Sequence, residues 1–136
     1  MNHVLFPDGN SEKISWIIQT EDSSVEQTRE HVKIYKNKIT DLQSKYVALH
    51  IGLFWGIGVF IIKNEDSLKI KIDEKPMFDH LNGSKKTNDE FIQNRIRFIN
   101  QLISQRRLKI QFELINQEAN PTKKTSNAKE IKTKNG

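Results

Sequence analysis

The chain has 136 residues, which is enough for one domain with one hydrophobic core and leaves little room for two. It contains no cysteine, which excludes disulfide bonds and thiolate metal sites. A formal net charge of +5 favours an anionic partner, with nucleic acid first and a membrane surface second.

The first part of the chain combines a β-rich section with the start of a helix. Residues 1–39 form the β-rich section, in which the polar segment 21–30 is expected to be a loop or hairpin tip. Thr40 and Gln43 have the spacing of a capping box, so a helix can begin there. We predict this helix over residues 40–62. Its core face has apolar side chains at helical intervals, namely Leu42, Tyr46, Leu49, Leu53 and Ile57.

Further elements follow in the second half of the chain. Leu68, Ile70 and Ile72 alternate with polar residues, which predicts a strand over 68–73 that ends on the carboxylate of Asp73. After it we expect a short helix over 76–81, a solvated linker over 83–88, a long helix over 89–107 and a last strand over 108–114.

From Asn120 onward the sequence is polar and basic. This segment contains five lysines and one glutamate and has almost nothing to bury, which predicts a disordered tail. We therefore expect a folded domain over residues 1–119 and a basic tail over residues 120–136.

The order of these elements resembles the ribonuclease H-like superfamily. SKYVALHIGL (44–53) is similar to the central helix of that family, and KIKIDEKPMFDHLNG (69–83) is similar to its fourth strand and following helix. The resemblance implies an α/β fold with a mixed five-stranded sheet and helices packed on it. It also implies that the antiparallel strands of this sheet are residues 3–10, 13–19 and 31–35.

The resemblance further implies where metal-binding carboxylates would lie. The family places two Mg²⁺ ions at the scissile phosphate by means of four carboxylates. Asp8 and Asp73 match two of these places, whereas Lys45 and, in QEANPTKK (117–124), Lys124 match the other two. A lysine ammonium has no lone pair for a metal and is positive where the cation should be. We therefore predict that Lys45 pairs with Asp8 or Asp73 and that catalysis is impaired.

An active enzyme with a rearranged site is the first alternative. Asp41 lies one turn before Lys45 on the same helical face, and together with Glu74 or Glu118 it could rebuild a shifted site. The chain would then be a Mg²⁺-dependent ribonuclease H that hydrolyses the RNA strand of an RNA–DNA hybrid. Whether the chain is an enzyme is open at this point.

A membrane span is the second alternative. Tyr46–Ile62 is 17 residues without formal charge, close to the lower limit for crossing a bilayer. We favour a helix buried over Tyr46–Phe60, because His50 lies near the middle and predicted strands lie on both sides. The N-terminus lacks the basic-then-apolar pattern of a secretion signal, so we expect a cytoplasmic protein.

A group of basic residues predicts a surface for nucleic acid. The group consists of Lys85, Lys86, Arg95, Arg97, Arg106 and Arg107. Contacts between such residues and phosphates give affinity without sequence readout. With the resemblance, they favour an RNA duplex or an RNA–DNA hybrid as the partner, and a protein partner is the further alternative.

Overall fold

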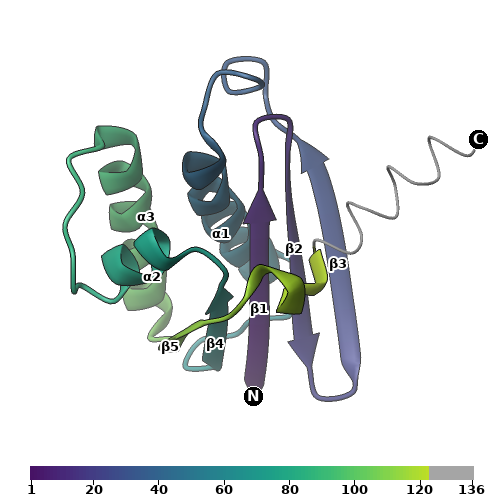
Figure 1. Ribbon diagram of the computed structural model, residues 1–136. Coiled ribbons are helices and arrows are strands. Elements are labelled where there is room, and N and C mark those ends of the chain that lie inside the picture. Colours follow the sequence, from purple (N-terminus) through teal and green to yellow (C-terminus); the bar gives the residue numbers. More distant parts are fainter. Residues whose placement is uncertain (123–136) are drawn as a thin grey trace, which may run out of the picture.

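A five-stranded sheet with the strand order β3-β2-β1-β4-β5 organises residues 1–122, which are the part of the chain that the computed structural model describes (Figure 1). The elements are β1 (Asn2–Gly9), β2 (Lys13–Thr20), β3 (Ser23–Glu30), α1 (Asp41–Gly58), β4 (Ser67–Ile72), α2 (Lys75–Leu81), α3 (Glu90–Arg106), β5 (Lys109–Leu114) and the 3-10 helix η1 (Gln117–Ala119). β1 pairs antiparallel with β2 and parallel with β4, so the predicted mixed sheet is confirmed.

The third strand lies in the segment that we predicted to be a loop. Residues 21–22 form the tip of the β2–β3 hairpin, but residues 23–30 form β3, so the predicted loop is wrong there. The strand predicted over 31–35 is also wrong, because a turn over residues 33–38 includes most of this segment. Glu21 has a φ of 53°, which allows a tight turn, and β3 then pairs with β2 along its whole length. As the edge strand it is mostly exposed and polar, and it therefore lacks the apolar alternation of a half-buried strand.

α1 begins where we predicted and ends earlier. The capping box is present, since the backbone N–H of Gln43 donates to Thr40 Oγ1 over 3.0 Å and that of Thr40 donates to Gln43 Oε1 over 2.9 Å. The helix ends at Gly58 rather than at residue 62, and Phe60 adopts the left-handed conformation, with a φ of 66°. Phe60 is 79% exposed, so the predicted burial of the helix is wrong at its C-terminal end.

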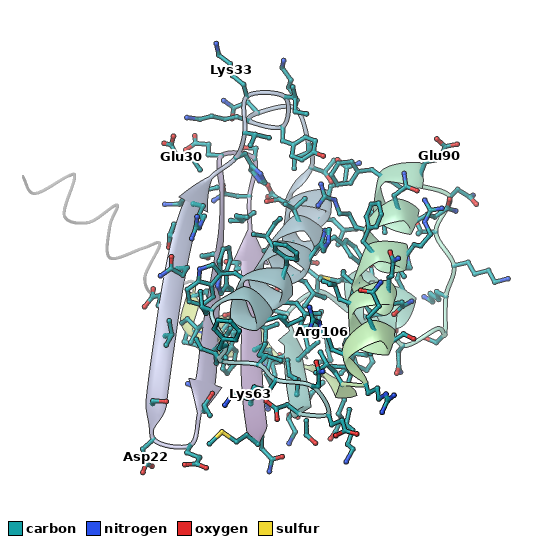
Figure 2. The ribbon with its side chains drawn as sticks, turned by 180° about the vertical axis from the view of Figure 1, so that it is seen from behind. Asp22, Glu30, Lys33, Lys63, Glu90 and Arg106 are labelled. Carbon is teal, nitrogen blue, oxygen red and sulfur yellow. The ribbon has the colours of Figure 1, made fainter. Side chains whose placement is uncertain are left out.

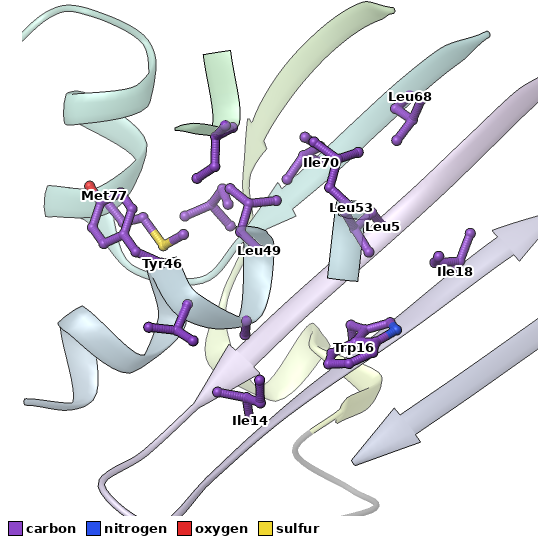
Figure 3. Close-up of a cluster of buried hydrophobic side chains, with 14 of the residues drawn as sticks. Leu5, Ile14, Trp16, Ile18, Tyr46, Leu49, Leu53, Leu68, Ile70 and Met77 are labelled. Atoms are coloured by element: carbon purple, nitrogen blue, oxygen red, sulfur yellow. The ribbon is translucent and has the colours of Figure 1, made fainter. Parts of the chain in front are cut away.

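The hydrophobic core lies between the sheet and the helices α1 and α3. Both helices are in front of the sheet when the molecule is seen from behind (Figure 2). Leu5, Trp16 and Ile70 of the strands pack with Tyr46 and Leu53 of α1 (Figure 3). Within residues 1–122, no helix has the length and apolar character needed to cross a membrane.

The C-terminal segment returns over β1 on the side away from α1 (Figure 1). Asn120 and Thr122 are fully buried, and Asn120 Nδ2 donates to the carbonyl oxygen of Pro7 over 3.3 Å. The boundary at residue 119 stays a prediction. Lys124 and most of the predicted tail lie outside the described residues.

Candidate functional site

The candidate site lies where β1 and β4 end beside α1. Asp8 is near the end of β1, and Asp73 directly follows β4. Because these two strands are parallel, their carboxyl ends meet at the same edge of the sheet. Lys45, in the second turn of α1, extends to the same point, so three of the predicted site residues come together.

The ammonium group of Lys45 is surrounded by three carboxylates. Its Nζ lies 3.0 Å from Asp73 Oδ1, 2.9 Å from Glu74 Oε1 and 3.8 Å from Asp8 Oδ1, so the predicted ion pair is present. Only 3% of Lys45 is exposed. Burial by itself would lower the pKa of Lys45, but the hydrogen bond to Glu74 and the charge of Asp73 outweigh it and raise that pKa. The amine is therefore a cation at neutral pH.

Amide side chains from the C-terminal segment complete the site. Asn120 Nδ2 donates to Asp73 Oδ2 over 3.0 Å, and Gln117 Nε2 donates to Glu74 Oε1 over 3.3 Å. The backbone N–H and the hydroxyl of Thr122 both donate to Asn120 Oδ1, which orients the amide. Our sequence reasoning missed these residues, although the resemblance of residues 117–124 to a family segment was a signal for them.

The donor set does not fit Mg²⁺. Glu74 joins the cluster, whereas Asp41 and Glu118 are exposed and form no ion pair with Lys45 among the described residues. In residues 1–122, no group of three or more carboxylate or histidine side chains is arranged to hold a metal ion. The ammonium of Lys45 places a positive charge where a cation would have to lie, and it offers no lone pair.

The guanidinium of Arg95 contacts other side chains of the protein. Its Nη1 lies 2.9 Å from His50 Nδ1, its Nη2 donates to Tyr35 Oη over 2.8 Å, and its guanidinium lies over the Phe91 ring. Burial, and then the charge of Arg95, lower the pKa of His50 to about 4, so the imidazole is a neutral acceptor. Arg95 therefore connects α3 with α1 and with the loop before it, a role that the sequence did not indicate.

The other predicted nucleic-acid contacts are divided between separate regions. Lys85 and Lys86 are exposed after α2 and, with His80, line a pocket of about 400 Å³. Tyr46 of α1 forms a hydrogen bond of 2.8 Å with His80, so one residue that lines this pocket contacts the helix that carries Lys45. Of the predicted contacts on and after α3, Arg97, Arg106 and Arg107 are exposed.

The net charge also has an uneven distribution along the chain. Residues 1–122 contain 17 of the 22 basic residues and 16 of the 17 acidic residues. The described part is therefore almost neutral, and most of the excess positive charge belongs to residues 123–136.

Comparison with known proteins decides the family. A family model described as "Reverse transcriptase-like" matches residues 9–125. The chain belongs to the reverse transcriptase-like family. Its fold is ribonuclease H-like, so the resemblance seen in the sequence is confirmed. A search of curated proteins finds no match.

Solved ribonuclease H structures share the fold of this family member. The ribonuclease H1 of Halobacterium salinarum superposes with a TM-score of 0.68 at 16% identity, over 88% of this chain and 89% of that one. The N-terminal ribonuclease H domain of a Mycobacterium tuberculosis protein gives 0.70 at 19%, over 88% and 91%. LC11 ribonuclease H1, solved with an RNA/DNA hybrid, gives 0.70 at 15%, over 88% and 89%.

Proposed function

We propose that this ribonuclease H-like domain binds RNA duplexes or RNA–DNA hybrids and that it is catalytically impaired. The observation that carries the proposal is the buried ammonium of Lys45, 3.0 Å from Asp73 and 2.9 Å from Glu74. The similarity in fold to LC11 ribonuclease H1, which was solved with an RNA/DNA hybrid, supports the choice of partner.

Impaired catalysis follows from the chemistry of the cluster. Hydrolysis of the ribonuclease H type depends on divalent cations that activate water and stabilise the leaving oxygen. Lys45 balances part of the negative charge of Asp8, Asp73 and Glu74 and donates to two of them, so it supplies the neutralisation that a metal would bring. An ammonium does not activate water as a Lewis acid does. The cluster is therefore suited to keeping its carboxylates paired rather than to cleavage.

The pocket after α2 supplies the first contacts with nucleic acid in this proposal. Lys85 and Lys86 are exposed at its edge, and His80 lines it. Lysine side chains contact phosphates in the same way whatever the base sequence, and the lysines of residues 123–136 add to this affinity. We expect A-form duplexes to bind better than B-form DNA, because their wide minor groove displays 2′-hydroxyl groups.

Calorimetric titration with Mg²⁺ tests the catalytic half of the proposal. We expect no binding heat and no cleavage of an RNA–DNA hybrid by the natural chain. The matched variant carries Lys45→Glu with Lys124→Asp, which gives all four family positions a carboxylate and is expected to bind Mg²⁺. Saturable Mg²⁺ binding and hybrid cleavage by the natural chain would instead establish the rearranged enzyme. The convergence of Glu74 with Asp8 and Asp73 is the observation in favour of that alternative.

Gel-shift titration at low and moderate salt tests the binding half. We expect a hybrid to shift at low salt, and the affinity to fall steeply as salt rises, because neutralised phosphates release counterions. Deletion of residues 123–136 should weaken all duplexes about equally. The deletion starts after Thr122 because Asn120 and Thr122 are buried. Lys85→Glu with Lys86→Glu should also weaken binding, whereas Lys33→Glu, an exposed control, should not. If no duplex shifts at micromolar protein, a protein partner replaces nucleic acid.

A further inference from the structure

The outer face of α1 and α3 combines exposed aromatic rings with basic residues. The sequence contains no aspartate or glutamate from Lys45 to Lys63 or from Phe91 to Arg107. Phe54 is nevertheless 61% exposed and Phe98 is 44% exposed. Large apolar side chains that gather on a surface mark sites of interaction more often than single exposed residues do.

The two helices lie side by side along this face. The His50 ring of α1 stacks on the Phe98 ring of α3 at 5.6 Å, and further along Ile57 and Arg106 line one pocket. Phe54 lies one turn after His50 and one turn before Gly58, so all three belong to one helical face. The exposed rings therefore lie along the two helices, in the direction of the C-terminal end of α1.

A pocket with a volume of about 510 Å³ lies at that end. We call it the Gly58 pocket. Ile57, Gly58, Phe60 and Ile62 form its apolar lining, and Lys63, Asn64 and Arg106 complete it. A Cβ atom placed on Gly58 would meet no other atom within 4 Å, so there is open space above this residue. Figure 2 shows Lys63 and Arg106 at the same end of the molecule, far from Lys33.

The backbone at the edge of this pocket keeps an aromatic ring in solvent. Phe60 has a φ of 66°, which is uncommon for a bulky residue, and its side chain is 79% exposed. Val59 beside it is 44% exposed. A left-handed conformation of this kind disfavours folding, and the ring gains little burial in return.

We propose that the Gly58 pocket binds an acidic segment of a partner protein. An apolar or aromatic anchor of that segment enters the pocket above Gly58, and its carboxylates pair with Lys63 and Arg106. Central apolar anchors with a charged rim are the usual arrangement of compact protein interfaces. Lys63 and Arg106 line the pocket, and the stretches 45–63 and 91–107 contain no acidic residue, so charge complementarity selects an acidic partner.

The shape of the site favours a protein segment over other anions. A pocket of this volume receives an inserted side chain, whereas a bilayer presents a continuous surface. Nucleic-acid phosphates would pair with the cations but would leave Phe54 and Phe60 against water. The pocket lies at the opposite end of α1 from Lys45, so this inference does not depend on the proposed function.

Selection from a random peptide-display library against the full chain tests the proposal. We expect enrichment of peptides that combine an aromatic or large aliphatic residue with at least two carboxylates. Fluorescence polarisation with the enriched peptides then measures affinity. Gly58→Trp, which occupies the pocket, should weaken binding at least tenfold. Gly58→Ala should leave it nearly unchanged, because the added methyl group meets no neighbour.

Charge-reversal variants test the rim independently of any effect on folding. Lys63→Glu and Arg106→Glu should each weaken the peptide, whereas Lys33→Glu makes the same charge change at the other end of the molecule and should not (Figure 2). The thermal midpoint of each variant identifies a folding defect. The proposal is overturned if no acidic–apolar peptide is enriched, or if enriched peptides bind Gly58→Trp and Arg106→Glu unchanged. It is also overturned if vesicles of phosphatidylglycerol bind with the same dependence while peptides do not.

Discussion

The two ends of α1 contrast in what they bury. Near its start, the ammonium of Lys45 is only 3% exposed, among carboxylates. At its end, Gly58 lines an open pocket and the Phe60 ring just after the helix is 79% exposed. Stability alone favours the reverse arrangement, because buried charges lose hydration and exposed rings gain none of the benefit of burial. Both ends of this helix are therefore the places where we expect interactions with other molecules.

Removal of the buried cation should have the largest effect. Lys45→Ala leaves Asp8, Asp73 and Glu74 without their central partner, and breaking a buried pair in this way costs about 3–5 kcal/mol of unfolding free energy. The matched control is Lys71→Ala, whose ammonium lies 2.8 Å from Glu113 on the surface and should matter much less. Urea unfolding of both variants measures the difference. Equal losses would mean that the Lys45 cluster is no more important than a surface pair.

Alanine substitutions at two glycines of α1 should have opposite effects on stability, one on its packed side and one at its open end. A Cβ atom on Gly52 would lie 2.9 Å from the Trp16 ring, and the buried indole has little space to move. Gly52→Ala should therefore destabilise the domain by about 1–3 kcal/mol through overpacking. Gly58→Ala meets no neighbour and should stabilise it by about 0.5–1 kcal/mol through helix propensity. Thermal unfolding of the pair checks the contrast, which fails if both changes have the same sign.

The capping box should give a smaller effect at the start of the same helix. Thr40→Ala removes the hydroxyl that accepts from the N–H of Gln43 and should cost about 1 kcal/mol. Thr40→Ser keeps the acceptor and should cost less. Chemical denaturation of the two variants tests the role of the cap. Identical stabilities for them would show that the hydroxyl contributes nothing.

The buried carboxylate of Asp66, just before β4, should affect the stability of the domain only at acidic pH. Burial by itself would raise the pKa of Asp66, but hydrogen bonds from His3 and from the backbone N–H of Lys63 lower it to about 2. Because its folded pKa is below the ordinary value of 3.8, Asp66 stabilises the fold above that pH and loses this contribution as the pH falls towards 2. Asp66→Asn should flatten the stability profile over this range, and unchanged profiles would contradict this assignment.

The sequence predicted most of the fold because periodicity and capping are local signals. The capping box of Thr40 is present, and the strand predicted over 68–73 and the long helix predicted over 89–107 lie within one residue of β4 and α3. β3 was missed because an edge strand requires no apolar face, so the polar composition of the turn at Glu21 continues through the strand that follows it. The end of α1 was extended too far because the apolar run continues after Gly58.

The charged residues of the candidate site were predicted from the sequence, whereas its amide side chains were missed. Lys45, Asp8 and Asp73 could be found because opposite charges in matched motif positions imply pairing. Asn120 could not be assigned in the same way, because its role depends on the return of the C-terminal segment across β1. Arg95 was placed on a binding surface because a single sequence does not show that His50 and Tyr35 lie beside it.

The strand order sets an expectation for how the domain folds. β1, β2 and β3 form two consecutive hairpins with short turns, whereas β1 also pairs in parallel with β4, so that Asn2 lies opposite Ser67. Hairpins close within microseconds, but contacts between distant parts of a chain slow the overall reaction. The β1–β4 pairing creates the sheet edge where Asp8 meets Asp73 and Lys45. We therefore expect the hairpins to form early and the Lys45 cluster to assemble in the late, rate-limiting step of folding.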